Sequence, residues 1–363
     1  MNDTAVLDIA TRQALAEAWG LSPRARFEPL GNGLINRTLL MRDDGRERVL
    51  QCLNTRVFRD PDLLMRNCHV VTAHLGRERA ASRYAYAVLE LMPTLAGDPA
   101  LVMQDGSWWR MYDHVPGTRT FQTADGPDMA YEAGRGFGAF VRALADLPSA
   151  VIGEVIPKFH DPVSRFESFR RALEADRAGR AGSCRGECEA ASAFAGIVRD
   201  WQTLLARGLP WRITHNDCKL NNLLFDDRRR AVCVVDLDTV MPGSPLFDFG
   251  DMVRTMVSPV AEDSTDLAGV KVRREVFAAL ARGYVDGCGA LLEPVERENL
   301  AFGARLITGV IGLRFLTDYL DGDRYFRVTH PEHNLERARN QLALFSALTE
   351  QSEALQALVP GTG

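Results

Sequence analysis

One polar loop enclosed by two apolar runs constrains this chain more than any other feature of its sequence. The loop extends from His215 to Asn222, and the apolar run Leu223–Phe225 follows it directly. A second run, rich in valine, covers residues 231–235 and ends at Asp236. Short runs of this composition, bounded by polar residues, are typical of β-strands. The stretch therefore predicts two neighbouring strands with a cluster of acidic and amide side chains beside them.

The spacing of these polar residues suits phosphoryl transfer. His215, Asp217 and Asn222 follow the H-x-D-x-x-x-x-N pattern of a phosphotransferase catalytic loop. Such a reaction needs a carboxylate to accept the proton of the attacking hydroxyl, and hard oxygen ligands for Mg²⁺. Asp217 fits the first task, and Asn222 and Asp236 fit the second. Lys219 is expected to contact the transferred phosphate as a point charge.

A plainer interpretation is a polar β-hairpin whose solvated turn is the charged run from Asp226 to Arg230. A lone H-x-D triplet would not separate the two interpretations, because such triplets are common. The complete set of His215, Asp217, Asn222 and Asp236, placed around two apolar runs, favours the catalytic interpretation.

These residues resemble a known superfamily. The run His215–Leu224 followed by Asp236 is similar to the aminoglycoside phosphotransferase and choline kinase superfamily, which has a protein-kinase-like fold. Within it, the chain resembles the N-acetylhexosamine 1-kinases most closely, through Lys219–Asn222, Val235–Gly243 and Gly312–Leu320. The resemblance extends from about residue 29 to about residue 348.

The resemblance implies an α/β (α+β) fold with two lobes. A small β-rich N-terminal lobe would bind the nucleotide (residues 1–113), and a larger, mainly helical lobe would carry the catalytic and acceptor sites (residues 114–363). The implied reaction is ATP- and Mg²⁺-dependent phosphorylation of the anomeric hydroxyl of an N-acetylhexosamine, with the nucleotide between the lobes. Two alternatives stay open: a kinase of another small alcohol (aminoglycoside, choline or homoserine), and a catalytically silent nucleotide-binding module.

A glycine-containing turn between two predicted strands is the candidate phosphate loop of the smaller lobe. Glycine backbone can approach phosphate oxygens because no Cβ blocks it. An ordinary hairpin turn explains the same residues, and only the downstream loop favours the nucleotide interpretation. Further along, an aromatic-rich strand from Trp108 runs into a Pro-Gly break and resembles the hinge that meets the adenine. The expected nucleotide contacts are Gly31, Asn32, Gly33, Asn36, Met111 and Asp113.

The third predicted strand departs from the general kinase pattern. Its core, Val49–Cys52, contains no lysine to pair with the phosphates, and the helix expected over about residues 61–75 contains no glutamate. The missing lysine slightly favours the silent module, whereas the intact Asp217, Asn222 and Asp236 argue against it more strongly. The arginines that could substitute are Arg37, Arg48, Arg56 and Arg66.

The acceptor site is expected to include Arg314, His160 and Asp217. Arg314 lies in a long apolar helical stretch, where a buried guanidinium needs a partner. It either donates to acceptor hydroxyls or forms a structural ion pair with Asp248, Asp251 or Asp318. His160 either lines the acceptor site or is a loop histidine satisfied within the protein, and the second interpretation is favoured. By resemblance, Asp248 or Asp251 also braces the catalytic loop, and Asp238 adds an outer contact to the metal.

Composition sets the remaining expectations. The 363 residues are 46% hydrophobic, which is enough for a sizeable core, and the net charge of −5 gives no reason to expect nucleic acid or an anionic membrane. Seven scattered cysteines do not suggest a disulfide framework. We expect no secretory signal, no apolar run near the roughly 20 residues of a membrane helix, and a cytoplasmic location. The expected partners are a small sugar and ATP, and the oligomeric state is left open.

Overall fold

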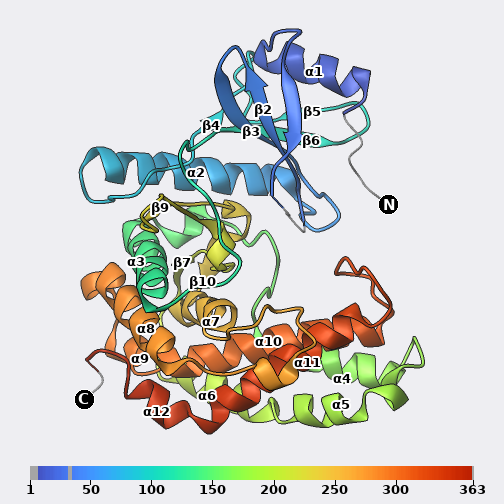
Figure 1. The fold of residues 1–363 in the computed structure, drawn as a ribbon, viewed down its shortest axis with the longest axis vertical. Helices are drawn as coiled ribbons and strands as arrows, with labels where there is room; N and C mark the ends of the chain where they lie inside the picture. Colours follow the sequence, from blue (N-terminus) through green and yellow to red (C-terminus); the bar gives the residue numbers. More distant parts are fainter. Residues whose placement is uncertain (1–6, 32–34, 362–363) are drawn as a thin grey trace. The chain divides into compact units, whose positions relative to one another are not determined.

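A computed structural model describes residues 7–31 and 35–361 of the chain (Figure 1). The chain folds into two compact units: the first extends to Gly117 and includes residues 150–156, and the second comprises residues 118–149 and the chain from Pro157 onward. The boundary expected at residue 113 thus lies shortly before the end of the first unit. Mixed α/β structure, with a β-sheet in the N-terminal part and helices in most of the remainder, agrees with the fold class expected from the sequence.

The first unit is built on an antiparallel six-stranded sheet. Its strand order is β1-β2-β3-β6-β4, and β5 pairs with β6 as well. The β2–β3 hairpin turns at Asp44 and Gly45, which have φ values of 45° and 78°. Positive φ at two successive turn residues matches the right-handed twist of the strands. The bounds in this unit are α1 Ile9–Trp19, β1 Arg26–Pro29, β2 Arg37–Asp43, β3 Arg46–Cys52, α2 Pro61–Ala80, β4 Leu91–Met92, β5 Leu101–Val102 and β6 Trp108–Asp113.

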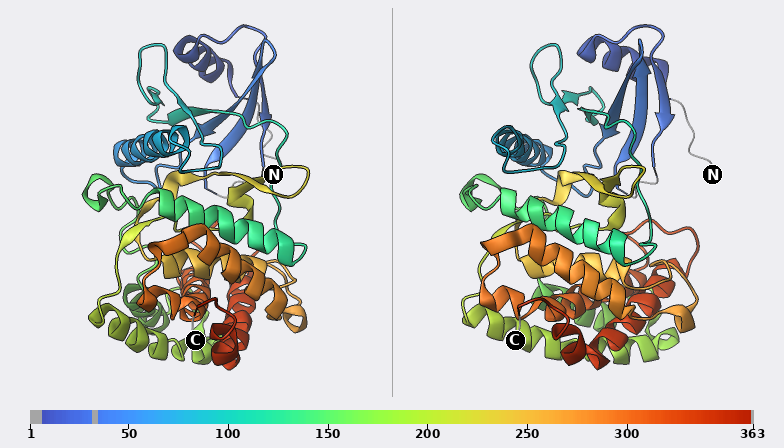
Figure 2. Two further views of the ribbon diagram at one scale, coloured as in Figure 1. Left: turned by 90° about the vertical axis from the view of Figure 1, so that its left-hand side faces the viewer. Right: turned by 60° about the vertical axis from the view of Figure 1, so that its left-hand side comes forward.

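Alternation along the strands gives this sheet two different faces. One face packs against α1 through a core cluster that includes Leu15, Trp19, Leu50 and Met111. Side chains at i and i+2 of a strand share a face, whereas their neighbours point the other way. Figures 1 and 2 show α1 and α2 on different sides of the sheet. The sheet thus brings polar side chains of β3 and β6 towards α2.

The second unit holds two short antiparallel ladders and a set of packed helices. The pairs are β7–β10 and β8–β9. Helices α3 and α8 run side by side (Figure 2). A Cβ at Gly138 would lie 2.9 Å from the Cys288 backbone nitrogen, so only glycine allows the two backbones to approach this closely. The strands are β7 Arg212–Thr214, β8 Leu223–Phe225, β9 Ala231–Val234 and β10 Met241–Gly243; the helices are α3 Pro127–Ala143, α4 Pro162–Ala175, α5 Arg185–Ser192, α6 Ala195–Ala206, α7 Pro245–Met256, α8 Arg274–Cys288, α9 Pro294–Arg297, α10 Leu300–Leu320, α11 His333–Glu350 and α12 Ser352–Gln356.

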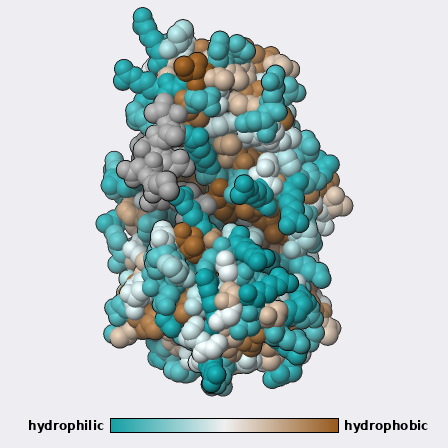
Figure 3. Space-filling view, turned by 90° about the vertical axis from the view of Figure 1, so that its right-hand side faces the viewer, coloured by the Kyte–Doolittle hydropathy of each residue, from teal (hydrophilic) through white to brown (hydrophobic). Residues whose placement is uncertain are grey.

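Helix α10 corrects one expectation from the sequence. It is long and apolar enough to cross a membrane by length and composition alone, with a mean hydropathy of 1.4, although no run of that kind was expected. In the structure, 83% of its apolar window is buried. Neighbouring α7 and α11 cover it, so its composition is that of a core helix. On the face drawn in Figure 3, hydrophilic side chains cover much of the helical unit.

Several predicted elements differ in their extents. The apolar periodicity of residues 4–19 predicts an amphipathic helix. The helix begins at Ile9, capped by Asp8, whose carboxylate accepts from the Thr11 amide at 2.7 Å. The sequence predicts a loop over residues 182–188 and one helix over residues 190–205. The structure has two helices there, α5 and α6, and α5 includes part of the predicted loop. The apolar run over residues 84–91 predicts a strand or short helix, but only its last residue, Leu91, lies in a strand, β4. Their apolarity reflects burial of Tyr84, Tyr86 and Leu89.

Candidate active site

The loop between β7 and β8 is held in place by one buried carboxylate. Asp248, in the first turn of α7, accepts hydrogen bonds from the backbone amides of His215 at 3.0 Å and Asn216 at 2.7 Å. Asp248 is fully buried, and burial raises its pKa to about 7 although the two amides act to lower it. Of the two acids expected to brace the loop, Asp248 therefore does so directly.

His215 serves the loop as a neutral imidazole. Its Nε2–H donates to the Val235 carbonyl at 2.9 Å, and its Nδ1 accepts from the Asp217 amide at 3.3 Å. The ring packs edge-on against Phe137 and Phe140. Burial lowers the pKa of His215. His215 thus links the loop to the strand that leads to Asp236, and it fixes the backbone at Asp217.

Asp217 lies at the centre of the site. The side-chain amide of Asn222 donates to an Asp217 carboxylate oxygen at 2.9 Å and to its backbone carbonyl at 2.8 Å. The Lys219 ammonium lies 3.1 Å from the same carboxylate oxygen. Burial acts to raise the pKa of Asp217, but Lys219 and His215 outweigh it, so the pKa is lowered. The carboxylate is therefore ionised at neutral pH and partly accessible, as a proton acceptor requires.

Asn222 and Asp236 offer oxygen atoms suited to Mg²⁺. Because the Asn222 nitrogen faces Asp217, its carbonyl oxygen is directed elsewhere. The backbone carbonyl of Asn222 accepts a hydrogen bond from the Val235 amide at 2.9 Å. Asp236 is the next residue after this contact. Asp236 is exposed and has a left-handed backbone, with φ 59° and ψ 61°. A non-glycine residue in that region is strained, and such strain concentrates at functional sites.

The oxygen ligands available at this site suit a magnesium ion. No group of three or more His, Cys, Asp or Glu side chains suited to a metal occurs in residues 7–31 and 35–361. Mg²⁺ in kinases uses one or two protein carboxylates together with substrate phosphates and water, so one aspartate and one asparagine fit it. Asp238, expected as an outer contact, is buried within the 3₁₀ turn Leu237–Thr239.

A buried arginine with two carboxylate partners lies close to the loop. Arg254 binds Asp251 at 2.6 Å and also pairs with Glu262. Burial acts to lower the pKa of Lys219, but the charges of Asp217, Asp251 and Glu262 raise it overall. Lys219 therefore stays protonated. Sequence reasoning missed Arg254 and Glu262, because nothing in the local pattern indicates that they approach the loop.

The two candidate acceptor residues have different surroundings. His160 is buried, and its Nε2–H donates to the Asn216 carbonyl at 2.8 Å, so it supports the catalytic loop. Arg314 is half-buried, with its guanidinium over the rings of Phe159, Tyr325 and Phe326 at 4.7–5.4 Å. The expected ion-pair partners are occupied: Asp248 by the loop, Asp251 by Arg254, and Asp318 by backbone amides such as that of Tyr325 at 2.8 Å.

The candidate nucleotide-binding residues of the first unit differ in their exposure to solvent. Gly31 is exposed, with φ 69°, and Asn36 accepts from the Asn54 amide at 3.0 Å. Asn32 and Gly33 lie outside the described residues. Met111 is fully buried in the core cluster between the sheet and α1, so its side chain is not available to a ligand.

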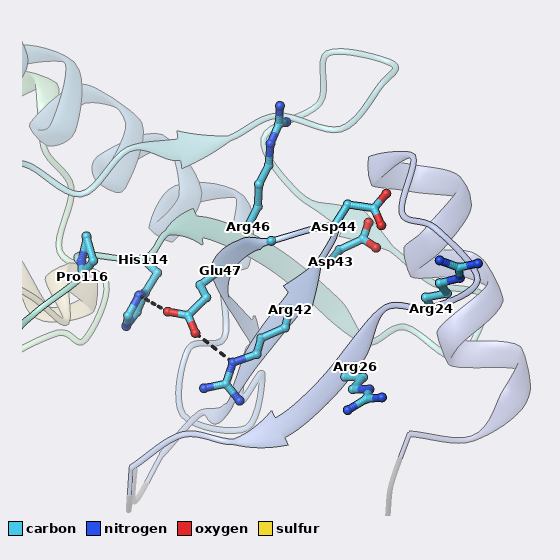
Figure 4. A pocket seen from close by; sticks show the side chains of 10 residues that line it. Arg24, Arg26, Arg42, Asp43, Asp44, Arg46, Glu47, His114 and Pro116 are labelled. Carbon is cyan, nitrogen blue, oxygen red and sulfur yellow. Dashed lines mark hydrogen bonds and ion pairs between the residues drawn. The ribbon is translucent and has the colours of Figure 1, made fainter.

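Asp113 closes β6 beside a charged hollow. Its carboxylate lies 3.6 Å from Arg48, one of the four arginines considered as substitutes for the lysine. Next to it, His114 pairs with Glu47 at 3.0 Å, and Glu47 in turn accepts from Arg42 at 2.8 Å (Figure 4). The charge of Arg48 is thus partly neutralised by Asp113, which makes Arg48 less suited to replace the lysine in binding phosphate.

One residue of the β3 stretch that lacks a lysine, residues 49–52, has an unexpected partner. Gln51 pairs in register with Arg110 on β6, and its side-chain oxygen accepts from that guanidinium at 2.8 and 3.0 Å. Arg110 is buried against α2, 3.5 Å from the Cys68 sulfur. Helix α2 extends to Ala80 and so does contain a glutamate, contrary to the shorter helix expected. That residue, Glu78, binds Arg83 at 2.5–2.7 Å.

Comparison with known proteins identifies the family. Residues 26–287 match the model of a phosphotransferase enzyme family. The chain belongs to this phosphotransferase family. Its fold is similar to that of an aminoglycoside phosphotransferase from Alicyclobacillus acidocaldarius (TM-score 0.60, 12% identity, 97% of this chain and 99% of that one). A spectinomycin phosphotransferase in complex with ADP and its antibiotic has a TM-score of 0.61 (12% identity, 95% and 99% covered). A choline/ethanolamine kinase family protein from Mesorhizobium loti has a TM-score of 0.57 (19% identity, 96% and 98% covered).

The family assignment confirms the superfamily expected from the sequence. The protein is a phosphotransferase of this family, which is the part of the expectation that the family match shows. The solved structures are below 25% identity and support the fold alone.

Proposed function

We propose that this phosphotransferase uses ATP and Mg²⁺ to phosphorylate the anomeric hydroxyl of an N-acetylhexosamine. The observation that carries the catalytic part is the double hydrogen bond from Asn222 to Asp217, which fixes the base and directs an amide oxygen away from it. The sugar assignment depends on the three runs that resemble N-acetylhexosamine 1-kinases.

Each residue of the loop has a separate task in this proposal. Asp217 accepts the proton of the sugar hydroxyl, because its lowered pKa keeps it ionised. Lys219 shares its charge between Asp217 and the transferred phosphate. Asn222 and Asp236 would hold Mg²⁺, which supplies charge neutralisation on the phosphates when bound. His215, Asp248 and His160 position the loop without touching substrate.

The nucleotide contacts are proposed on the first unit. The turn at Gly31, Asn36 and the end of β6 at Asp113 are the described candidates, and Met111 is better explained as a core residue. The residue that replaces the β3 lysine stays open. We also retain, as a proposal, the division into a nucleotide-binding part ending near residue 113 and a catalytic and acceptor-binding part after it.

The surroundings of Arg314 bear on the choice of acceptor. Its guanidinium lies against three aromatic rings, and a second arginine, Arg165, lines the same cavity. Two cations disfavour a cationic acceptor such as choline or an aminoglycoside. An arginine and aromatic rings are suited to a sugar, whose hydroxyls accept hydrogen bonds and whose C–H faces pack on rings. The silent-module alternative is disfavoured by the intact catalytic loop.

One assay tests the proposal. The purified protein, with ATP and Mg²⁺, is given a panel of free sugars, amino alcohols and aminoglycosides, and the position of any new phosphate is read by phosphorus NMR. We expect a sugar 1-phosphate from N-acetylglucosamine or N-acetylgalactosamine. Transfer only to an amino alcohol or aminoglycoside would establish the alternative kinase, and binding of ATP with no transfer to any acceptor would establish the silent module.

A further inference from the structure

A small cavity in the second unit is lined by two arginines from different helices. Arg165 comes from α4 and Arg314 from α10, and the volume is about 140 Å³. That volume is well below the several hundred Å³ of a typical ligand pocket, so it suits one substituent of a ligand rather than a whole sugar. The other lining residues are Ser168, Thr317, Asp318, Asp321, Tyr325 and Phe326.

Phe159 connects the two arginines. Its carbonyl accepts a hydrogen bond from Arg165 Nε at 3.0 Å, and its ring lies under the Arg314 guanidinium at 4.7 Å. Arg314 Nη2 also donates to the Tyr325 hydroxyl at 3.3 Å. Both guanidiniums are thus oriented by neutral groups, which hold them in place without an ion pair.

The carboxylates of the cavity are already engaged elsewhere. Asp318 accepts from three successive backbone amides, those of residues 324–326, and from the Asn334 side chain. Asp321 lies 3.7 Å from Arg177. Across residues 7–31 and 35–361, neither Arg165 nor Arg314 forms an ion pair. Burial, and after it the neighbouring charge of Arg314, lower the pKa of Arg165 to about 10.

The cavity is close to the catalytic loop. Phe159 precedes His160, whose Nε2–H donates to the Asn216 carbonyl next to Asp217. Arg314 and Asp217 both act on the buried His160, the arginine lowering its pKa and the aspartate raising it. Contacts through Phe159 and His160 therefore connect the Arg314 guanidinium to the residue next to Asp217.

We propose that Arg165 and Arg314 form a subsite for an oxyanion, a carboxylate or a phosphate, carried by the acceptor. Two adjacent like charges in a partly buried cavity are costly, and a bidentate anion relieves that cost. The preferred acceptor is then an acidic sugar in which the anionic substituent lies away from the anomeric hydroxyl. This inference rests on the proposed function for the identity of the sugar, but the anion site itself does not.

The kinetic test compares acidic and neutral acceptors. N-acetylhexosamines with and without a carboxylate or phosphate at C3, C4 or C6 are assayed with the wild type, Arg165→Gln, Arg165→Lys and Arg170→Gln. Arg170 lies on the same helix and is exposed, so it is the matched control. For the best acidic acceptor, we expect the acid-to-neutral ratio of kcat/KM to fall at least about tenfold in Arg165→Gln. The fall should be smaller in Arg165→Lys and absent in Arg170→Gln.

Binding measurements separate this inference from the proposed function. The acidic sugars and inorganic phosphate are titrated calorimetrically into the wild type and the Arg165 variants without nucleotide, and melting temperatures confirm folding. If no sugar is phosphorylated but an acidic sugar binds in an Arg165-dependent way, the proposed function fails and the subsite stands. Inorganic phosphate binding that matches the acidic sugar, with no change in the kinetic ratio, would overturn the assignment to the acceptor. An acidic sugar that binds no better than its neutral counterpart would also overturn the subsite. Should Arg165→Gln not fold, the Arg165→Lys ratio and affinity decide.

Discussion

The side-chain amide of Asn222 donates to both the carboxylate and the backbone carbonyl of Asp217, at 2.9 and 2.8 Å. A five-residue separation is what allows one amide to reach both acceptors. The bond orients the base, and it also decides which atom of Asn222 is left for a metal. The five-residue spacing between Asp217 and Asn222 in the sequence thus corresponds to a direct contact in the structure.

Replacement of Asp217 by asparagine should abolish turnover. The substitution removes the proton acceptor and places an amide opposite the Asn222 nitrogen, so we expect kcat to fall by at least about 100-fold. ATP affinity, measured by calorimetry, should be unchanged, and Asp200→Asn on an exposed helical position serves as control. Turnover near that of the wild type in folded Asp217→Asn would remove Asp217 as the base.

Replacement of Asp236 by alanine should change the magnesium requirement. A divalent cation loses a charged oxygen ligand, so we expect either no activity or a half-saturating Mg²⁺ concentration raised about tenfold or more. Alanine keeps a Cβ at this left-handed position, so the substitution does not relieve the backbone strain and the melting temperature is not expected to rise. Activity that persists in excess chelator would contradict the metal role.

Asp248→Asn should destabilise the protein by about 1–3 kcal/mol, because asparagine has one oxygen for two amide donors.

The contribution of Asp248 to the pH dependence of stability follows from its raised pKa of about 7. Between about pH 4 and 7 the folded protein retains a proton that the unfolded chain has lost, so this group makes stability fall as pH rises. Denaturant unfolding across that range should show this contribution in the wild type and not in the variant. Identical pH profiles would contradict it.

His160 should change the pH dependence of stability in the direction opposite to that of Asp248. Burial lowers its pKa to about 3, so at pH below about 6.5 the unfolded chain binds a proton that the folded protein does not. Stability from this group is present above pH 6.5 and is lost as pH falls. In His160→Gln, which can still donate to Asn216, the loss of stability between pH 6.5 and 4 should be smaller than in the wild type. The substitution His69→Gln, at an exposed position of α2, is the control.

Gly243→Ala tests the packing under the loop. A Cβ there would collide with the Thr214 hydroxyl and lie 2.6 Å from Asn216 Oδ1. We expect lower stability and reduced kcat, because the residue displaced adjoins Asp217. Gly186→Ala, in an exposed helical turn with open space around it, should instead be neutral or slightly stabilising. If both variants have wild-type kcat and melting temperature, the loop does not depend on this contact.

The catalytic loop was predictable because its signals are local. The spacing of Asp217, Asn222 and Asp236 and the apolar runs around them fall within about 20 residues, and the two strands pair as those runs indicate. The superfamily and the fold class followed from the same stretch. The end of α1 has a local signal as well, because Gly20 is a glycine in the left-handed conformation that commonly ends a helix.

Contacts between distant segments were decided only by the tertiary structure. The sequence around Gln51 does not indicate a contact with Arg110, 59 residues away, because the pairing of β3 with β6 brings the two side chains together. Met111 read as a hinge residue, yet its side chain faces α1 in the core, since alternation along β6 depends on which face of the sheet is covered. Likewise, Arg165 and Arg314 become neighbours only because α4 and α10 pack together. The sequence by itself determined the local chemistry of the loop, and packing decided which charges surround it.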